Sequence, residues 1–324
     1  MKVHLFNPEN DLALASGEAN YTPPLSVRRF KEALAWLPKW YAEPGDVILT
    51  PDSRPEIPAD ATPAPWGWSA NTVALFRRAG MNGPFPDVEA IRRLSHRRTA
   101  LLLHRELSRD GNLPYPLPPE PVEVTDASEI TSGDILLKSP WSCSGRGVVD
   151  CSGMTRESIV SIARGIIRRQ GSVMMEKKLD KTEDFALLFE TENGTTQFKG
   201  ISSFFTSPAR NAYGGNLCAS QEELREKLPK LQLDATISAV NAAINRIIAP
   251  FYSGPVGVDM ILYGPERTIC PTIEVNLRRT MGFVSLELYN RLGRGIFRIL
   301  PHPADGIQLI KHNPYFSATF TPEP

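Results

Sequence analysis

The sequence lacks a long hydrophobic run, and it lacks an excess of charge of either sign. None of its apolar segments approaches the roughly 20 residues that a membrane-spanning helix requires. Lysine plus arginine number 36 and aspartate plus glutamate also number 36, so the formal net charge is zero. A neutral chain gives no indication that nucleic acid or an anionic membrane surface is its main partner.

Cysteine is scarce as well, with four residues spread over the chain: Cys143, Cys151, Cys218 and Cys270. Their spacing does not match the paired cysteines of zinc sites, and it favours reduced thiols in a cytoplasm. The first residues, MKVHLFNPEND, contain neither the apolar core nor the small-residue cleavage site of a secretory signal. We therefore expect a cytoplasmic protein.

Two widespread motifs for phosphate binding are also missing. The glycine-rich segment 141–147, WSCSGRG, has no Gly-Lys-Ser/Thr end, so it is not a P-loop. It is not a dinucleotide-binding fingerprint either, because a strand and not a helix is predicted to follow it. The five histidines are dispersed, and no Ser-His or Cys-His arrangement indicates nucleophilic catalysis.

What is present is the composition of a folded protein with several parts. The 324 residues are 41% hydrophobic and 22% charged, which are ordinary values for a chain long enough for two or three subdomains. The first 90 residues or so alternate strand and helix patterns, as a small doubly wound α/β unit does. The rest reads as an α+β body with antiparallel strands.

Local patterns predict the segments around the later candidate sites. Residues 8–21, after the first strand, and the proline-rich residues 55–68 are predicted as loops. Residues 91–111 are predicted as one basic helical segment that ends at Gly111.

The most informative segment is 254–278, GPVGVDMILYGPERTICPTIEVNLR, where two strand patterns flank a Gly-Pro turn. Side chains alternate along a strand, so Glu274 and Asn276 share one face, and antiparallel pairing brings Asp259 nearly opposite Glu274. Three oxygen-bearing side chains on one face suit Mg²⁺. Arg278 points the same way and suits an anionic group beside the metal. The alternative is a solvated polar face on an edge hairpin.

A second informative position is Lys138, which ends the apolar strand ILLK just before the glycine-rich segment. Serine and glycine in that segment allow backbone N–H groups to close around phosphate oxygens. Alternatively, the lysine only caps a strand and extends its ammonium group to water. The segment alone does not distinguish the two.

The order of these features resembles the ATP-grasp superfamily. Lys138 precedes the glycine-rich segment, an apolar strand ends in Glu176, and Asp259 and Glu274-x-Asn276 follow. Members of the superfamily include D-alanine–D-alanine ligase, glutathione synthetase, biotin carboxylase and carbamoyl phosphate synthetase. The resemblance extends from about residue 95 to about residue 281. It implies an ATP-grasp body of two lobes with antiparallel sheets behind the α/β amino-terminal domain.

The resemblance implies the following nucleotide-binding roles. Arg97, or its neighbour Arg98, and Lys138 would hold the ATP phosphates. The glycine-rich flap over them would be formed by Ser144, Gly145 and Gly147. Adenine would be lined by Glu176 and by the backbone from Lys177 to Leu179. Either Glu183 or Asp184 would bind the ribose.

It also implies the metal site and the catalytic groups. Asp259, Glu274 and Asn276 would hold one or two Mg²⁺ ions, with Glu274 between them if two are bound. Arg278 would face the transferred phosphate or the bound acid, and Lys138 would add positive charge. The sequence departs from the D-alanine ligase branch at Gly257, where that branch has an arginine. Because of this difference, the resemblance does not identify the substrate.

The activity implied is the Mg-ATP-dependent ligation of a carboxylic acid to an amine or thiol through an acyl phosphate. The alternatives are a kinase-like phosphoryl transferase on the same fold and a non-catalytic nucleotide-binding module. The expected partners are therefore small-molecule acids and amines.

Two segments are candidates for the second substrate. One contains Arg210, Tyr213 and Asn216, and the other contains Glu9 and Asn10 after the first strand. Each is also compatible with a plain surface loop. The expected domains are 1–90 (α/β), 91–175 (small lobe with the glycine flap) and 176–324 (large lobe with the metal site).

Overall fold

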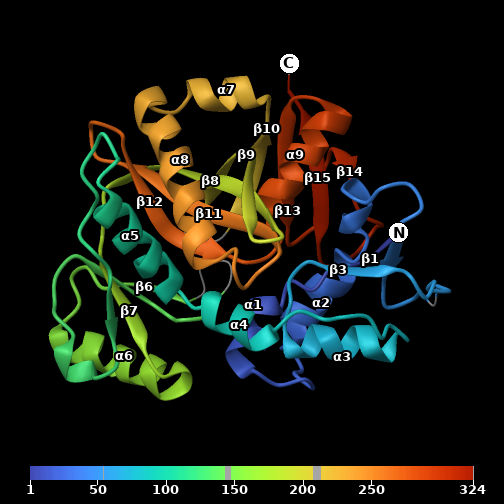
Figure 1. Cartoon of the computed structure of the whole chain (residues 1–324), viewed down its shortest axis with the longest axis horizontal. Coiled ribbons are helices and arrows are strands. Elements are labelled where there is room, and N and C mark those ends of the chain that lie inside the picture. The colour runs from blue at the N-terminus through green and yellow to red at the C-terminus, as the bar shows by residue number, and fades with distance from the viewer. Residues whose placement is uncertain (54, 143–146, 207–212, 324) are drawn as a thin grey trace.

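The computed structural model describes residues 1–53, 55–142, 147–206 and 213–323. In this part of the chain the strands form three sheets, of three, four and eight strands. Figure 1 shows the amino-terminal unit on one side of the molecule and the four-stranded sheet on the opposite side, with the eight-stranded sheet between and above them. None of the described helices is both long enough and apolar enough to cross a lipid bilayer.

The amino-terminal unit is a small parallel α/β fold. Its sheet has the order β2-β1-β3, with β1 (Lys2–Leu5), β2 (Val47–Leu49) and β3 (Thr62–Pro65). Its helices are α1 (Asn10–Ser16), α2 (Leu25–Ala33), the 3₁₀ helix η1 (Leu37–Trp40) and α3 (Ala70–Arg78). Val3 and Leu5 pack on Phe76 in one core cluster, while Phe6 packs with Trp66 in another. This agrees with the predicted doubly wound pattern.

The loop prediction is wrong for parts of two segments here. Residues 10–16 form α1, and residues 62–65 form β3 although two of these four residues are proline. Because β3 lies at the edge of its sheet, a residue that lacks an N–H group is tolerated there.

The basic segment 91–111 is not one helix but two, α4 (Val88–Leu94) and α5 (Arg98–Asp110). The backbone N–H of Arg97, between them, donates to the carbonyl oxygen of Pro140 at 3.0 Å. Gly111 ends α5 in the left-handed conformation, with φ of 62°, as its sequence position predicts.

The four-stranded sheet, called the small sheet below, has the order β4-β7-β5-β6. Its strands are β4 (Val122–Val124), β5 (Ile135–Lys138), β6 (Val148–Asp150) and β7 (Val173–Lys177), with the 3₁₀ helix η2 (Ala127–Glu129) and the helix α6 (Arg156–Gln170). Leu137 and Val173 pack on Ile159 and Ala163 of α6. Because side chains alternate, Lys138 and Glu176 point to the opposite face.

The eight-stranded sheet, called the large sheet below, has the order β12-β11-β8-β9-β10-β13-β15-β14. Its strands are β8 (Lys181–Glu192), β9 (Thr195–Thr206), β10 (Tyr213–Cys218), β11 (Gly254–Tyr263), β12 (Thr268–Asn276), β13 (Gly295–Leu300), β14 (Ile307–Gln308) and β15 (Ser317–Pro322). The helices α7 (Gln221–Glu226), α8 (Lys230–Ile247) and α9 (Met281–Leu292) belong to the same part of the chain. Pairing throughout these two sheets is antiparallel.

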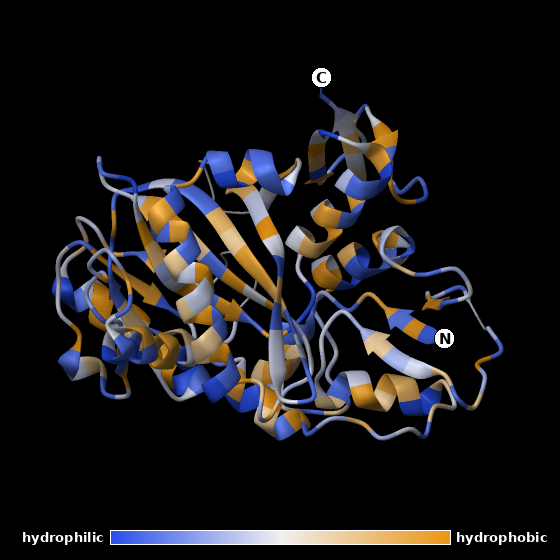
Figure 2. Ribbon diagram, turned by 45° about the horizontal axis from the view of Figure 1, so that its top comes forward, coloured by the Kyte–Doolittle hydropathy of each residue, from blue (hydrophilic) through white to orange (hydrophobic). Residues whose placement is uncertain are grey.

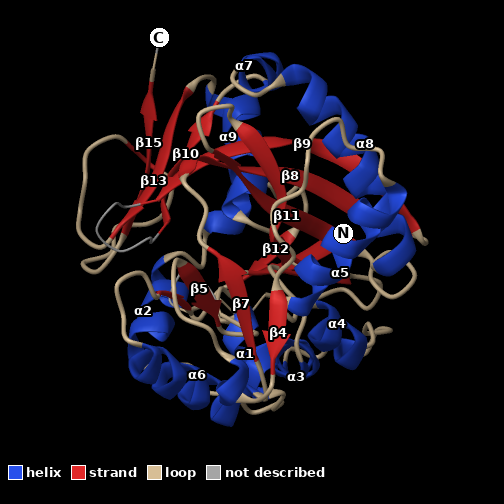
Figure 3. Ribbon diagram, turned by 90° about the vertical axis from the view of Figure 1, so that its left-hand side faces the viewer, coloured by secondary structure: helices blue, strands red, loops and turns tan. Residues whose placement is uncertain are grey.

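Helices cover the large sheet on both faces. Leu103 of α5 and Val240 of α8 pack with Phe185 and Val258 on one face, and Phe283 of α9 packs on Leu188 on the other. Figure 3 shows α5 and α8 side by side along the strands, and Figure 2 shows the hydrophobic residues gathered on the strands that they cover. Since α5 packs on the large sheet, the chain passes to the small sheet between α5 and β4, and it returns to the large sheet after Lys177. The domain limits themselves stay a prediction.

Candidate active site

The hairpin of β11 and β12 brings the three predicted metal-binding side chains together. Its register pairs Asp259 with Glu274, as the sequence predicts, and pairs Gly257 with Asn276. The Asn276 Nδ2 atom donates to Asp259 Oδ2 at 3.2 Å. The register shifts just beyond Asp259, where Pro271 in β12 cannot donate a ladder hydrogen bond.

This carboxylate pair has a deficit of positive charge. Loss of hydration, together with the charge of Glu274, raises the pKa of Asp259 to about 7, although the guanidinium of Arg278 acts in the opposite direction. A bound divalent cation would remove this repulsion, so the donor set fits Mg²⁺. No cluster of three or more His, Cys, Asp or Glu side chains that could hold a metal occurs in the described ranges, so the candidate set is two carboxylates and an amide.

Arg97 connects this pair to the glycine-rich segment. One terminal nitrogen of its guanidinium lies 3.0 Å from Glu274 Oε1 and donates to Ser142 Oγ at 3.0 Å. The residue is only 7% exposed, and its Nε has no hydrogen-bond partner among the described residues. A buried N–H without a partner is costly, and a phosphate oxygen is a natural acceptor for it. Arg98 instead pairs with Glu123 at the surface.

Lys138 and Glu176 form an ion pair on the face of the small sheet that is turned away from α6. Lys138 is 3% exposed, and neighbouring strands β5 and β7 position the pair. Burial raises the pKa of Cys270, on β12, to about 12, and the charges of Glu176 and Lys138 also act on this thiol. The ion pair therefore faces the large sheet.

The residues after Glu176 leave the small sheet for the large one. Lys177 is the last residue of β7, and the carbonyl of Leu179 accepts from the N–H of Lys181, the first residue of β8. This segment therefore connects the two sheets.

Glu183 and Asp184 lie on opposite faces of β8. Asp184 pairs in register with Ile261, so it shares the face of Asp259, and its charge helps to raise the pKa of Asp259. Glu183 accepts a hydrogen bond from Arg267 on the other face at 2.5 Å. Of these two residues, Asp184 is therefore the one that faces the candidate active site.

Arg278 contacts the amino-terminal unit. Its NH2 lies 2.9 Å from Asp11 Oδ2, and its Nε donates to both Asp11 oxygens at 3.1 and 3.2 Å. Its backbone bridges to Gly67, where an added Cβ would lie 2.5 Å from Asn10 Nδ2. A side chain at position 67 would therefore displace Asn10.

The other predicted substrate residues have protein partners. Glu9 is buried and accepts from Lys31 at 2.5 Å, and Asn10 is buried against Gly67. The Tyr213 hydroxyl donates to Asn216 Oδ1 at 2.5 Å, and the Asn216 amide donates to Ser202 at 2.8 Å.

The glycine-rich segment is described only at its ends. Ser144, Gly145 and Arg210, all predicted site residues, lie outside the described residues. At Gly147 an added Cβ would lie 2.3 Å from the Cβ of Ser142, so a side chain there would displace Ser142 from Arg97.

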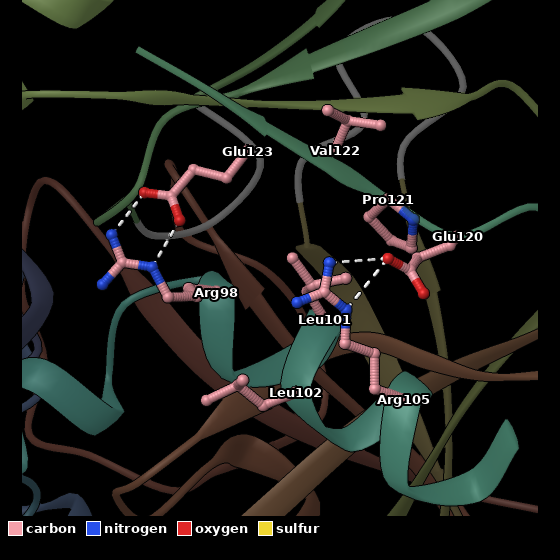
Figure 4. Close-up of a pocket in the computed structure, with 8 residues that line it drawn as sticks. All are labelled: Arg98, Leu101, Leu102, Arg105, Glu120, Pro121, Val122 and Glu123. Atoms are coloured by element: carbon pink, nitrogen blue, oxygen red, sulfur yellow. Dashed lines mark hydrogen bonds and ion pairs between the residues drawn. The ribbon is translucent and has the colours of Figure 1, made fainter. Parts of the chain in front are cut away.

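A hollow of about 380 Å³ lies elsewhere, between α5 and β4. Figure 4 shows its lining residues and the ion pairs of Arg98 with Glu123 and of Arg105 with Glu120. These charges neutralise one another, and none of Lys138, Arg97 and Asp259 lines the hollow. The charged groups therefore favour the region around Arg97, and not this hollow, as the candidate active site.

Sequence reasoning missed Ser142 and Asp11. Both lie in segments that it selected, 141–147 and 8–21, but their partners are distant in the sequence. The position of Asp11 after β1 was an available signal, because ligands of open α/β sheets bind at the carboxyl ends of strands.

Solved structures resemble the chain over most of its length. Phosphoribosylamine–glycine ligase from Thermotoga maritima is 11% identical, with a TM-score of 0.56, and the match covers 98% of this chain and 90% of that chain. The biotin carboxylase domain of 2-oxoglutarate carboxylase from Hydrogenobacter thermophilus, in complex with MgADP, ADP and bicarbonate, is 14% identical, with a TM-score of 0.53 and coverage of 93% and 75%. A protein described as of the ATP-grasp superfamily, from Archaeoglobus fulgidus, is 12% identical, with a TM-score of 0.51 and coverage of 99% and 98%. No protein-family profile and no curated protein sequence matches the chain.

Proposed function

The chain has the ATP-grasp fold, and on that premise we propose that it is a Mg-ATP-dependent ligase that joins a carboxylic acid to an amine or thiol through an acyl phosphate, with release of ADP and phosphate. A ligase and a carboxylase domain in complex with MgADP share this fold. The observation that supports the proposal most is the position of Arg97, which contacts both Ser142 and Glu274 and keeps one buried N–H for an acceptor.

In this proposal the nucleotide lies between the small and the large sheet. Its phosphates are held by Arg97, Lys138 and the glycine-rich segment. In that segment the residues that contact the phosphates are Ser144, Gly145 and Gly147. Glu176 and the backbone of Lys177 to Leu179 line the adenine. Asp184 binds the ribose hydroxyls, since Glu183 faces the other side of the sheet.

Asp259, Glu274 and Asn276 hold one or two Mg²⁺ ions, which supply positive charge to the transferred phosphoryl group. The raised pKa of Asp259 supports this role, because burial without a cation, together with the charge of Glu274, disfavours its ionised carboxylate. Arg278 and Lys138 complete the positive surroundings of the reaction.

The acid substrate binds at Arg278. The Arg278 side chain already contacts one carboxylate, that of Asp11. The second substrate enters from the amino-terminal unit, residues 1–90, near Glu9 and Asn10, or from the segment of Arg210, Tyr213 and Asn216. Residues 91–175 and 176–324 are the two lobes of the ATP-grasp body.

The test is to trap an acyl phosphate with hydroxylamine. Purified protein, MgATP and hydroxylamine are incubated with sets of amino acids and other carboxylic acids, and ferric hydroxamate and ADP are measured. We expect hydroxamate and ADP in equal amounts with at least one acid. A phosphorylated product without hydroxamate would favour a kinase-like transferase instead. Absence of ADP release with every acid would favour a non-catalytic nucleotide-binding module.

A further inference from the structure

Arg92, on α4, lies between the amino-terminal unit and the phosphate-binding residues. Its Nε donates to the carbonyl of Leu14 at 2.7 Å, and its NH2 donates to the carbonyl of Ala15 at 3.4 Å. Both carbonyls belong to the last turn of α1, where carbonyl groups lack intrahelical partners and a cation is favourable. Arg92 therefore fixes the carboxyl-terminal end of α1.

The same side chain also contacts Trp141, next to Ser142. The Arg92 Cζ lies 4.7 Å from the centre of the indole ring, and the indole N–H donates to the backbone carbonyl of Arg92 at 3.1 Å. The side-chain amide of Gln170 also holds the backbone of Trp141. It accepts from the backbone N–H of Trp141 at 2.9 Å and donates to the backbone carbonyl of Trp141 at 3.1 Å. The Arg92 guanidinium thus connects α1 to a well-fixed residue of the nucleotide site.

The other end of α1 is fixed by a second arginine. Asp11, in its first turn, pairs with Arg278, which follows the metal-binding strand β12. Glu274 of that strand pairs with Arg97, and Arg97 donates to Ser142. The contacts therefore form a closed ring, from Ser142 and Trp141 through Arg92, α1 and Arg278 to Glu274 and Arg97.

From this ring we infer that Arg92 is a positioning residue, which transmits nucleotide binding at Arg97 and Ser142 to α1 and so fixes Asp11 beside Arg278. The inference rests on the proposed nucleotide site. A phosphate on Arg97 and Ser142 restricts the ring on one side, and α1, held by an arginine at each end, loses motion as a result. Arg278, the arginine proposed to bind the acid, therefore takes a fixed position when the nucleotide is bound.

The test is hydrogen exchange of the peptide that covers residues 10–17, with and without saturating MgADP. In the unaltered protein we expect MgADP to slow exchange in α1 by about fivefold or more, the lower end of typical coupling between sites. In Arg92→Met the slowing should disappear while calorimetry still detects MgADP binding. Arg92→Lys, which keeps the charge but loses the planar stacking, should retain part of it. Arg93→Met, on the exposed side of the same helix, is the matched control and should respond as the unaltered protein does.

Three results would overturn the inference: no slowing in the unaltered protein, full slowing in Arg92→Met, or loss of MgADP binding in a folded Arg92→Met. If Arg92→Met does not fold, an Arg92→Lys variant with an undiminished response decides against it in the same way. Failure of the proposed function looks different, because the unaltered protein then shows no MgADP binding in calorimetry.

Discussion

Arg97 and Arg98 are neighbours in the sequence, yet their side chains lie in different surroundings. Arg97 is buried between Ser142 and Glu274, whereas Arg98 pairs with Glu123 at the surface. Arg97→Met should therefore weaken MgADP binding by about 10- to 100-fold, the size of a charge-assisted hydrogen bond. Arg98→Met is the matched control, and calorimetry should find its affinity nearly unchanged. Equal losses in both variants would contradict the assignment of Arg97.

Glu274 pairs with Arg97 and lies opposite Asp259 in the hairpin. Glu274→Gln keeps the volume and removes the charge, so it should abolish Mg²⁺-dependent ADP release and leave the circular dichroism spectrum unchanged. Glu266→Gln, in the exposed turn of the same hairpin, is the control with an unaltered rate. If Glu274→Gln retained full Mg²⁺-dependent turnover, the metal assignment would be wrong.

His96, which precedes Arg97, makes the free energy of unfolding depend on pH. Its Nδ1 accepts the backbone N–H of Arg98 at 2.9 Å, so the ring is neutral there. Burial, aided by the nearby Arg98, lowers its pKa to about 4. In the unfolded chain the pKa of His96 is near 6.5, so the unfolded state binds the proton more readily than the folded state. The contribution of neutral His96 to the free energy of unfolding is therefore present above pH 6.5 and is lost as the pH falls toward 4.

Urea unfolding between pH 7 and pH 4 tests this expectation. His96→Asn keeps an acceptor for the same N–H but does not titrate, so its free energy of unfolding should fall less over this range. An identical fall in both proteins would show that His96 does not contribute.

Side-chain alternation explains which site residues the sequence could predict. Asp259, Glu274 and Asn276 belong to one hairpin, and strand periodicity with a single turn was enough to bring them together. The choice between Glu183 and Asp184 needed the register of β8 on β11, which the sequence does not state. Asp11 and Ser142 were missed because their partners lie on other elements.

Among the elements, the end of β5 and the start of β6 come close where Gly147 lies against Ser142. In Gly147→Ala the new Cβ would meet Ser142 at 2.3 Å, so the variant should lose about 1–3 kcal/mol of stability and bind MgADP more weakly. Gly165→Ala, in the interior of α6 with only the end of Arg169 nearby, should instead gain about 0.5–1 kcal/mol. Thermal unfolding and calorimetry measure both. Equal nucleotide affinity in Gly147→Ala and the unaltered protein would contradict the role of Ser142.

Elements with clear local signals were predicted, and those set by tertiary contact were not. Ser69, Thr155 and Ser220 are residue types favoured at helix N-caps, and each side chain accepts a backbone N–H of its helix. Asn193 and Gly194 adopt the positive φ values of a tight hairpin turn. The strand β3 is formed by pairing with β1 in spite of its prolines. The break between α4 and α5 depends on Pro140, more than 40 residues away, and no local residue indicates it.

At the scale of the whole molecule, three sheets meet around a few arginines. Arg97 connects the small sheet to the large one, and Arg278 connects the large sheet to the amino-terminal unit. Strand and helix periods are local, and they predicted an α/β unit followed by an α+β body with antiparallel strands. The division of that body into two lobes with antiparallel sheets was implied by the family resemblance. It did not predict that α5 covers the large sheet, since this packing depends on α8.

The proposed site at the junction of the small and large sheets binds one nucleotide together with Mg²⁺. Calorimetric titration with ADP, in Mg²⁺ and then in excess EDTA, measures this binding. We predict binding of one ADP per chain that weakens strongly when Mg²⁺ is removed and again in Arg97→Met. A folded protein that produces no heat of binding, or that binds equally well with EDTA and with Arg97→Met, would show that the site is assigned wrongly.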